Sequence, residues 1–172
     1  MYLRESEKEY IKYNNFVDDV FSFVEDFQLL RPDLWRRFVQ QFREDADYEA
    51  GWRGEYWGKM MRGACFVYSY NKDEKLYSLL TQTVKDMMAV VREDGRLSTY
   101  LQEQEFGGWD MWCRKYVLLG MQYFMEICDD PQLKAELTES MCKQLDYIME
   151  HVGPGEGKKL ITKTTSHWRG LN

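Results

Sequence analysis

Apolar residues recur along most of the chain at the three- and four-residue spacing of an α-helix. In residues 10–27, apolar residues lie on one side of such a helix, while lysine and acidic residues occupy the other. The apolar positions are Tyr13, Phe16, Val17, Val20, Val24 and Phe27. With its proline and glycine breaks, the pattern predicts helices over residues 10–27, 33–43, 55–70, 74–92, 110–127 and 131–152. Asp130 is expected to cap the last helix, with Pro131 in its first turn. We expect an extended segment over residues 158–165.

A glycine-rich turn followed by a helix that begins with aromatic residues occurs twice, in units of about 51–95 and 107–153. Four apolar positions of the first unit return 55 residues later, and four positions of its second helix return 57 residues later. The matching positions are Trp57, Met61, Ala64 and Tyr68 with Trp112, Tyr116, Leu119 and Tyr123, and Leu76, Leu80, Val84 and Met88 with Leu133, Leu137, Met141 and Leu145. Such a repeat predicts an all-α fold of stacked helical hairpins, one domain over residues 1–172, because no single hairpin can bury its own core.

The net charge and the lack of long apolar runs argue against some classes of binding partner for this chain. The formal net charge is -6, so the chain offers no basic surface for nucleic acid or for an anionic membrane. It contains no apolar run of membrane-spanning length and no signal peptide, so the expected location is the cytoplasm by default.

Four cysteines and two histidines are too few and too scattered for a metal site. The cysteines lie inside helical patterns without a closely spaced pair, so we expect buried residues or free thiols. No metal ligand is therefore assigned.

The helices over 55–70 and 110–127 are expected to run parallel, which brings their N-terminal ends together. Aromatic and acidic residues gather there: Trp52, Glu55, Trp57, Trp109, Asp110, Trp112 and Tyr116, with Tyr100 returning from the following turn and His167 within possible reach. Tryptophan beside acids suits a sugar, because C–H faces stack on the rings and hydroxyls bond to carboxylates. Alternatively, Trp52 and Trp109 cover the helix ends, and whether Trp52 and Trp57 face a cleft or the core stays open.

Glu55 and Asp110 allow two interpretations. They match the two carboxylates of a glycosidase, and they also match ordinary first-turn acids that the helix dipole favours. We assign them no catalytic role. Arg53, Arg62 and Arg114 are expected to pair with acids.

Four segments taken together resemble the beta-L-arabinofuranosidase-like glycoside hydrolases. They are GWRGEYWGKMMRGA (51–64), DGRLSTY (94–100), WDMWCRKYVLLG (109–120) and HWRGLN (167–172). The resemblance covers the chain from about residue 30 onward.

This resemblance implies an (α/α)6 barrel and hydrolysis of terminal furanosides with retention. It also implies a cysteine nucleophile at a zinc site of further cysteines and a glutamate, with another glutamate as acid/base. None of the four cysteines here falls at such a motif, so no nucleophile or ligand is carried over, and zinc is implied only for a longer protein. Trp109, Asp110, Trp112 and Tyr116 match the segment that contributes sugar contacts in the family. At Cys113 some relatives have a substrate-contacting histidine, which bears on the identity of the sugar.

The chain is therefore predicted to be the N-terminal half of a catalytic barrel acting on terminal beta-L-arabinofuranoside-like sugars of plant glycans. As such a fragment, an incomplete ring of hairpins, it is expected to be inactive and to self-associate through exposed barrel surface. One alternative is a non-catalytic helical-repeat module that binds a peptide in its groove. Another is a different (α/α)-barrel glycan hydrolase in which Asp110 is catalytic.

Overall fold

Helices make up most of the structure, a computed structural model that describes residues 13–45 and 48–159. The longer ones are α1 (Phe16–Val24), α2 (Pro32–Gln40), α4 (Glu55–Asn71), α5 (Glu74–Met88), α6 (Asp110–Ile127) and α7 (Pro131–His151). Short pieces join them: a π-helix (Glu25–Leu29), α3 (Tyr48–Gly51) and 3-10 turns at Trp52–Gly54 and Gln102–Gln104. The all-α prediction is confirmed.

The predicted boundaries hold best where the sequence supplies a cap. The Asp130 carboxylate accepts hydrogen bonds from the backbone N–H groups of Gln132 and Leu133, as expected at the start of α7. Asp73 caps α5 in the same way. Of the expected extended segment, the structure describes only residues 158–159, where Lys159 forms an isolated parallel bridge with Val152.

The first helix differs from its prediction. α1 begins at Phe16 behind the N-cap Asn15, while residues 10–12 lie outside the described part. Part of the apolar stripe that predicted it faces away from the core: Phe16 is 77% exposed and Phe27 67%. Val24 of that stripe does pack against the core, together with Phe21, which was not part of the stripe.

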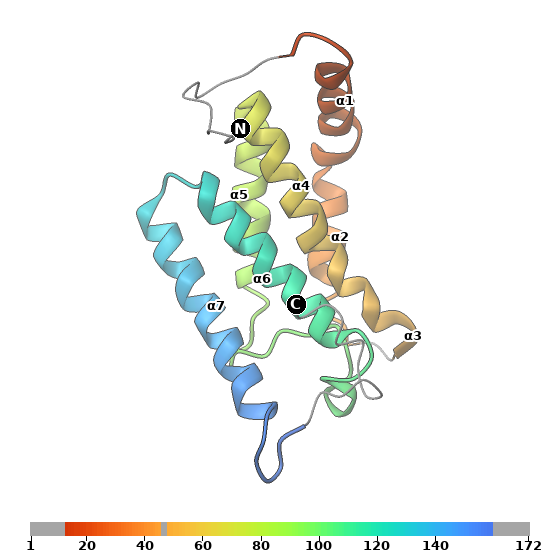
Figure 1. The fold of residues 1–172 in the computed structure, drawn as a ribbon, viewed down its shortest axis with the longest axis vertical. Coiled ribbons are helices and arrows are strands. Elements are labelled where there is room, and N and C mark those ends of the chain that lie inside the picture. Colours follow the sequence, from red (N-terminus) through yellow and green to blue (C-terminus); the bar gives the residue numbers. More distant parts are fainter. Residues whose placement is uncertain (1–12, 46–47, 160–172) are drawn as a thin grey trace, which may run out of the picture.

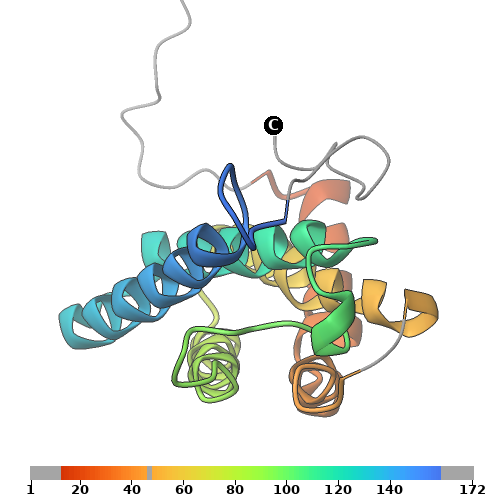
Figure 2. The same ribbon diagram turned by 90° about the horizontal axis from the view of Figure 1, so that it is seen from below.

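Two antiparallel hairpins stack side by side. α4 and α5 form the first hairpin and α6 and α7 the second, and α4 and α6 run in the same direction (Figure 1). Seen from below, α4 and α6 form one layer and α2 and α5 a second, with α7 beside α6 (Figure 2). The N-terminal ends of α4 and α6 consequently lie together, as predicted.

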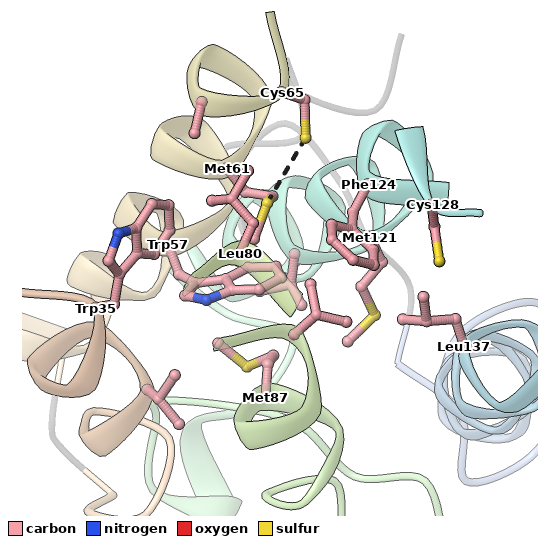
Figure 3. Close-up of a cluster of buried hydrophobic side chains, with 14 of the residues drawn as sticks. Trp35, Trp57, Met61, Cys65, Leu80, Met87, Met121, Phe124, Cys128 and Leu137 are labelled. Carbon is pink, nitrogen blue, oxygen red and sulfur yellow. Dashed lines mark hydrogen bonds between the residues drawn. The ribbon is translucent and has the colours of Figure 1, made fainter. Parts of the chain in front are cut away.

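A sulfur-rich apolar core fills the space between the layers. Trp57, Met61, Leu80, Met87 and Phe124 are fully buried there (Figure 3). The Trp57 indole also satisfies its polar end, because its Nε1–H donates to Thr83 Oγ1 at 3.0 Å.

α4 and α6 touch almost backbone to backbone at two glycines. A methyl group added to Gly58 would lie 1.8 Å from the carbonyl oxygen of Tyr116, and one on Gly120 would lie 3.0 Å from the Cα of Gly58. Only residues without a side chain permit this approach. The spacing of the two hairpins therefore depends on these positions.

The repeated faces of α4 and α6 do not have the same surroundings, which corrects the simplest interpretation of the repeat. In α4 the face with Trp57 and Met61 points into the core, whereas Trp112 and Tyr116 on α6 are only partly buried. α6 instead buries the face one position further along, which contains Cys113, Val117, Gly120 and Phe124. α6 is thus rotated about its own axis relative to α4, and its Trp112 face stays accessible.

Replacing Gly58 with alanine should destabilise the protein. The clash with α6 should lower the free energy of unfolding by about 2–3 kcal/mol, more than the gain of about 1 kcal/mol in helix propensity can offset. Gly63 is the matched control on α4, because an added methyl group there meets nothing within 4 Å. Gly63→Ala should raise stability by about 0.5–1 kcal/mol. Urea unfolding measures both, and a Gly58→Ala variant as stable as the wild type would contradict the close packing.

Candidate functional site

A pocket opens where the first turns of α4 and α6 lie together. It has a volume of about 370 Å³ and is lined by Trp52, Glu55, Lys59, Trp109 and Trp112. We call it the tryptophan pocket. Trp52, Glu55 and Lys59 come from the first hairpin and its entry turn, and the other two come from the second.

The polar groups of the pocket are already paired with one another. The Trp112 Nε1–H donates to Glu55 Oε2, and Lys59 Nζ lies 2.8 Å from Glu55 Oε1. The rings of Trp109 and Trp112 meet edge to face with centroids 5.7 Å apart, and Tyr116 packs against Trp112 at 5.1 Å. Flat aromatic faces and one oriented carboxylate therefore line a single hollow.

The loop between α5 and α6 holds in place the turns that carry Trp52 and Trp109. Tyr100 is fully buried against Gly51, where an added methyl group would lie 2.7 Å from its ring. Its hydroxyl oxygen accepts a hydrogen bond from the backbone N–H of Trp109 at 3.2 Å. Thr99 donates to the carbonyl oxygen of Gly51. The turns that present Trp52 and Trp109 are therefore tied to each other.

Asp110 lies under the pocket with no exposed surface, and both of its carboxylate oxygens are occupied. Oδ1 accepts from Ser98 Oγ at 2.5 Å, and Oδ2 accepts from the Phe106 N–H at 2.9 Å and from Arg114 Nε at 2.8 Å. Arg114 also pairs with Glu105 Oε2 at 3.1 Å. The carboxylate holds the loop to the first turn of α6.

Glu105 extends this buried network across the second hairpin. It pairs with Arg96 as well as with Arg114, and Tyr147 of α7 donates to its Oε2 at 2.8 Å. Burial, followed by the hydrogen bond to Glu105, raises the pKa of Tyr147 above its ordinary value, so the phenol stays protonated. Two buried arginines thus face two buried acids, Asp110 and Glu105, and the expected pairing of Arg114 is confirmed.

The structure divides the predicted site residues into three groups. Trp52, Glu55, Trp109 and Trp112 line the pocket, and Tyr116 adjoins them. Trp57, Tyr100 and Asp110 are completely buried and cannot touch a ligand in this arrangement. His167 lies outside the described residues.

The correction for Trp57 has a physical reason. Its equivalence to Trp112 in the sequence suggested a shared position at the helix ends, but the rotation of α6 leaves only Trp112 accessible. Lys59, by contrast, lines the pocket without having been predicted. Its position four residues after Glu55, on the same helix face, was the available signal.

Residues 10–169 match the model of the family described as Beta-L-arabinofuranosidase, GH127 catalytic domain. The chain belongs to this family. Neither the curated proteins nor the solved structures that were searched include a match to the chain. The described helical hairpins agree with the (α/α)6 barrel that was expected, and membership of a glycoside hydrolase family implies a carbohydrate substrate.

No zinc-bound nucleophile was assigned to the cysteines of this GH127 chain from its sequence. Among residues 13–45 and 48–159, no three His, Cys, Asp or Glu side chains lie close enough together to hold a metal ion. Burial, and then the nearby acids Asp110 and Glu55, raises the pKa of the Cys113 thiol, and burial raises that of Cys65 to about 12. We derive no zinc-dependent step from these residues. In the same part of the chain, no helix has both the length and the apolar character that crossing a bilayer requires.

Asp110→Asn should destabilise the chain, because it leaves the buried Arg114 short of one negative partner. We expect a loss of about 3 kcal/mol in the free energy of unfolding. Glu139→Gln is the control, since Glu139 forms an exposed pair with Lys143 and its loss should not move the urea midpoint measurably. Equal midpoints for the two variants would exclude a structural role for Asp110.

Proposed function

We propose that the tryptophan pocket binds the terminal sugar of a plant glycan, a beta-L-arabinofuranoside or a closely similar furanoside. The convergence of Trp52, Trp109 and Trp112 on one hollow beside Glu55 carries this proposal. A furanose ring presents C–H faces to aromatic rings and hydroxyls to a carboxylate, and the pocket offers both surfaces. Membership of the GH127 family supports a carbohydrate as the ligand.

We further propose that these residues bind the sugar without cleaving it. Glycoside hydrolysis needs two reacting groups on either side of the scissile bond. Glu55 is the one acid among the described residues that line the pocket, and it is held by Lys59 and Trp112. The chain by itself should therefore release no aglycone from an aryl beta-L-arabinofuranoside.

The two alternative functions receive less support. A peptide-binding repeat would use the long faces of its helices, whereas the tryptophans here gather at the helix ends. A catalytic role for Asp110 needs access to substrate, and its carboxylate is buried and fully hydrogen-bonded.

Removing one tryptophan tests the binding proposal. Trp109 is 37% exposed and lies at the end of α6, so Trp109→Ala should leave the fold intact. We expect about tenfold weaker binding of methyl beta-L-arabinofuranoside, from the loss of one stacking face. Calorimetric titration measures this affinity. Phe23→Ala is the control, because Phe23 is an exposed aromatic residue on α1. Undetectable binding to the wild type, or equal affinities of all three proteins, would refute the proposal.

Self-association is also part of the proposal. A groove of about 390 Å³ runs between α6 and α7, with apolar side chains that include Leu118, Leu119 and Ile148 along it. Leu145 on its wall is 45% exposed. Exposed apolar surface of this kind favours contact with a second copy.

Sedimentation velocity should show association that increases with protein concentration. Leu145→Glu should shift the distribution toward monomer, because it places a charge in the apolar groove. Lys143→Glu, on an exposed position of the same helix, controls for added negative charge. A wild-type protein that sediments as a clean monomer at high concentration would exclude the prediction.

A further inference from the structure

Two lysine ammonium groups lie over the same two aromatic rings beside the tryptophan pocket. Lys59 Nζ on α4 is 5.5 Å from the centroid of Trp112 and 4.9 Å from that of Tyr116. Lys115 Nζ on α6 is 4.4 Å and 4.9 Å from the same two centroids. The rings of Trp112 and Tyr116 are thus in contact with cations from both hairpins.

The charges around this pair do not balance. Glu55 neutralises Lys59, but Lys115 forms no ion pair with any residue in the described part of the chain. Arg62, one turn beyond Lys59, lies over the rings of Phe66 and Tyr123 at 5.9 Å and 5.6 Å. Among the described residues that contact Trp112 and Tyr116, two cations, Lys59 and Lys115, meet a single acid, Glu55. This local excess is the reverse of the net charge of -6 for the whole chain.

The surroundings of Lys115 favour an anion. Partial burial and then the charge of Lys59 lower its pKa. Both effects penalise an unpaired ammonium, and the opposite charge of a bound carboxylate would offset that penalty. A neutral hydroxyl would accept a hydrogen bond without compensating the charge. The protein therefore gains more from an acidic ligand than from a neutral one at this position.

We infer that the pocket takes an acidic glycan, in which a uronic acid residue lies next to the stacked sugar and its carboxylate binds Lys115, which lies over the Trp112 ring but is not among the residues that line the pocket. The inference rests on the proposed sugar site and narrows its substrate class. Lys115 is the residue that sets the preference, because Lys59 also serves Glu55. Arg62 extends the same cationic surface along α4 for further acidic units.

The opposing interpretation is that the lysine stems only cover the rings. Long side chains often cover aromatic surface while the ammonium stays in water. In that case the charge on the ligand should make no difference, and truncating Lys115 should affect acidic and neutral ligands alike. The two interpretations therefore differ in what they predict for a matched pair of ligands.

The test uses an arabinose-terminated oligosaccharide that contains one glucuronic acid, and the same oligosaccharide after reduction of its carboxyl group to an alcohol. Calorimetric titration of the wild type should give about five- to tenfold tighter binding of the acidic form at low salt, a preference that declines as salt is added. Lys115→Gln should abolish the preference and keep the affinity for the reduced form. Lys115→Arg should retain the preference, because it keeps the charge. Lys75→Gln, which removes an exposed lysine of α5, should behave like the wild type.

The outcomes separate this inference from the proposed function. Equal binding of the two oligosaccharides by the wild type would overturn the acidic preference and leave the sugar site standing. An equal loss of affinity for both ligands in Lys115→Gln would also overturn it, since the lysine would then act only as packing. If neither oligosaccharide binds, the sugar site itself is wrong, and the inference falls with it.

Discussion

The buried carboxylate of Asp110 is the interaction on which the tryptophan pocket depends. It joins the first turn of α6 to the loop that precedes it, through Ser98, the Phe106 backbone and Arg114. Through Arg114 and Glu105, the same network reaches Tyr147 on α7. Each charge is paired, so burial imposes a single geometry instead of leaving an uncompensated ion. The position of Trp109 and Trp112 therefore follows from groups that a ligand does not reach.

The sequence predicted the helices and their order well, for reasons that are local. Spacing of apolar residues gives the helices, and side chains such as Asp73 and Asp130 mark where they begin. The repeat gave the parallel course of α4 and α6. It could not give the rotation of α6, because periodicity defines a face without saying which neighbour covers it. Trp57 and Trp112 are alike in sequence, yet one is in the core and the other lines a pocket.

The sequence predicted which residue types gather at the candidate site, but it did not predict how each side chain is placed there. Glu55 and Asp110 each occupy the first turn of a helix, and local sequence cannot distinguish the half-buried acid from the fully buried one. Part of the difference comes from residues further away in the chain: Trp112 holds Glu55 across the two hairpins, whereas Ser98 from the preceding loop holds Asp110. The cationic environment of Trp112 depends likewise on side chains from two helices, and it becomes visible only once α4 and α6 are placed side by side.

The division of the pocket between two hairpins links ligand binding to the packing of the helices. Glu55 and Lys59 belong to α4, Trp112 belongs to α6, and the glycine contact at Gly58 fixes their spacing. A ligand that touches both sides binds only the docked hairpins, so its binding free energy adds to the work needed to separate them. Occupancy of the pocket by such a ligand and the packing of the two hairpins are then coupled in one equilibrium.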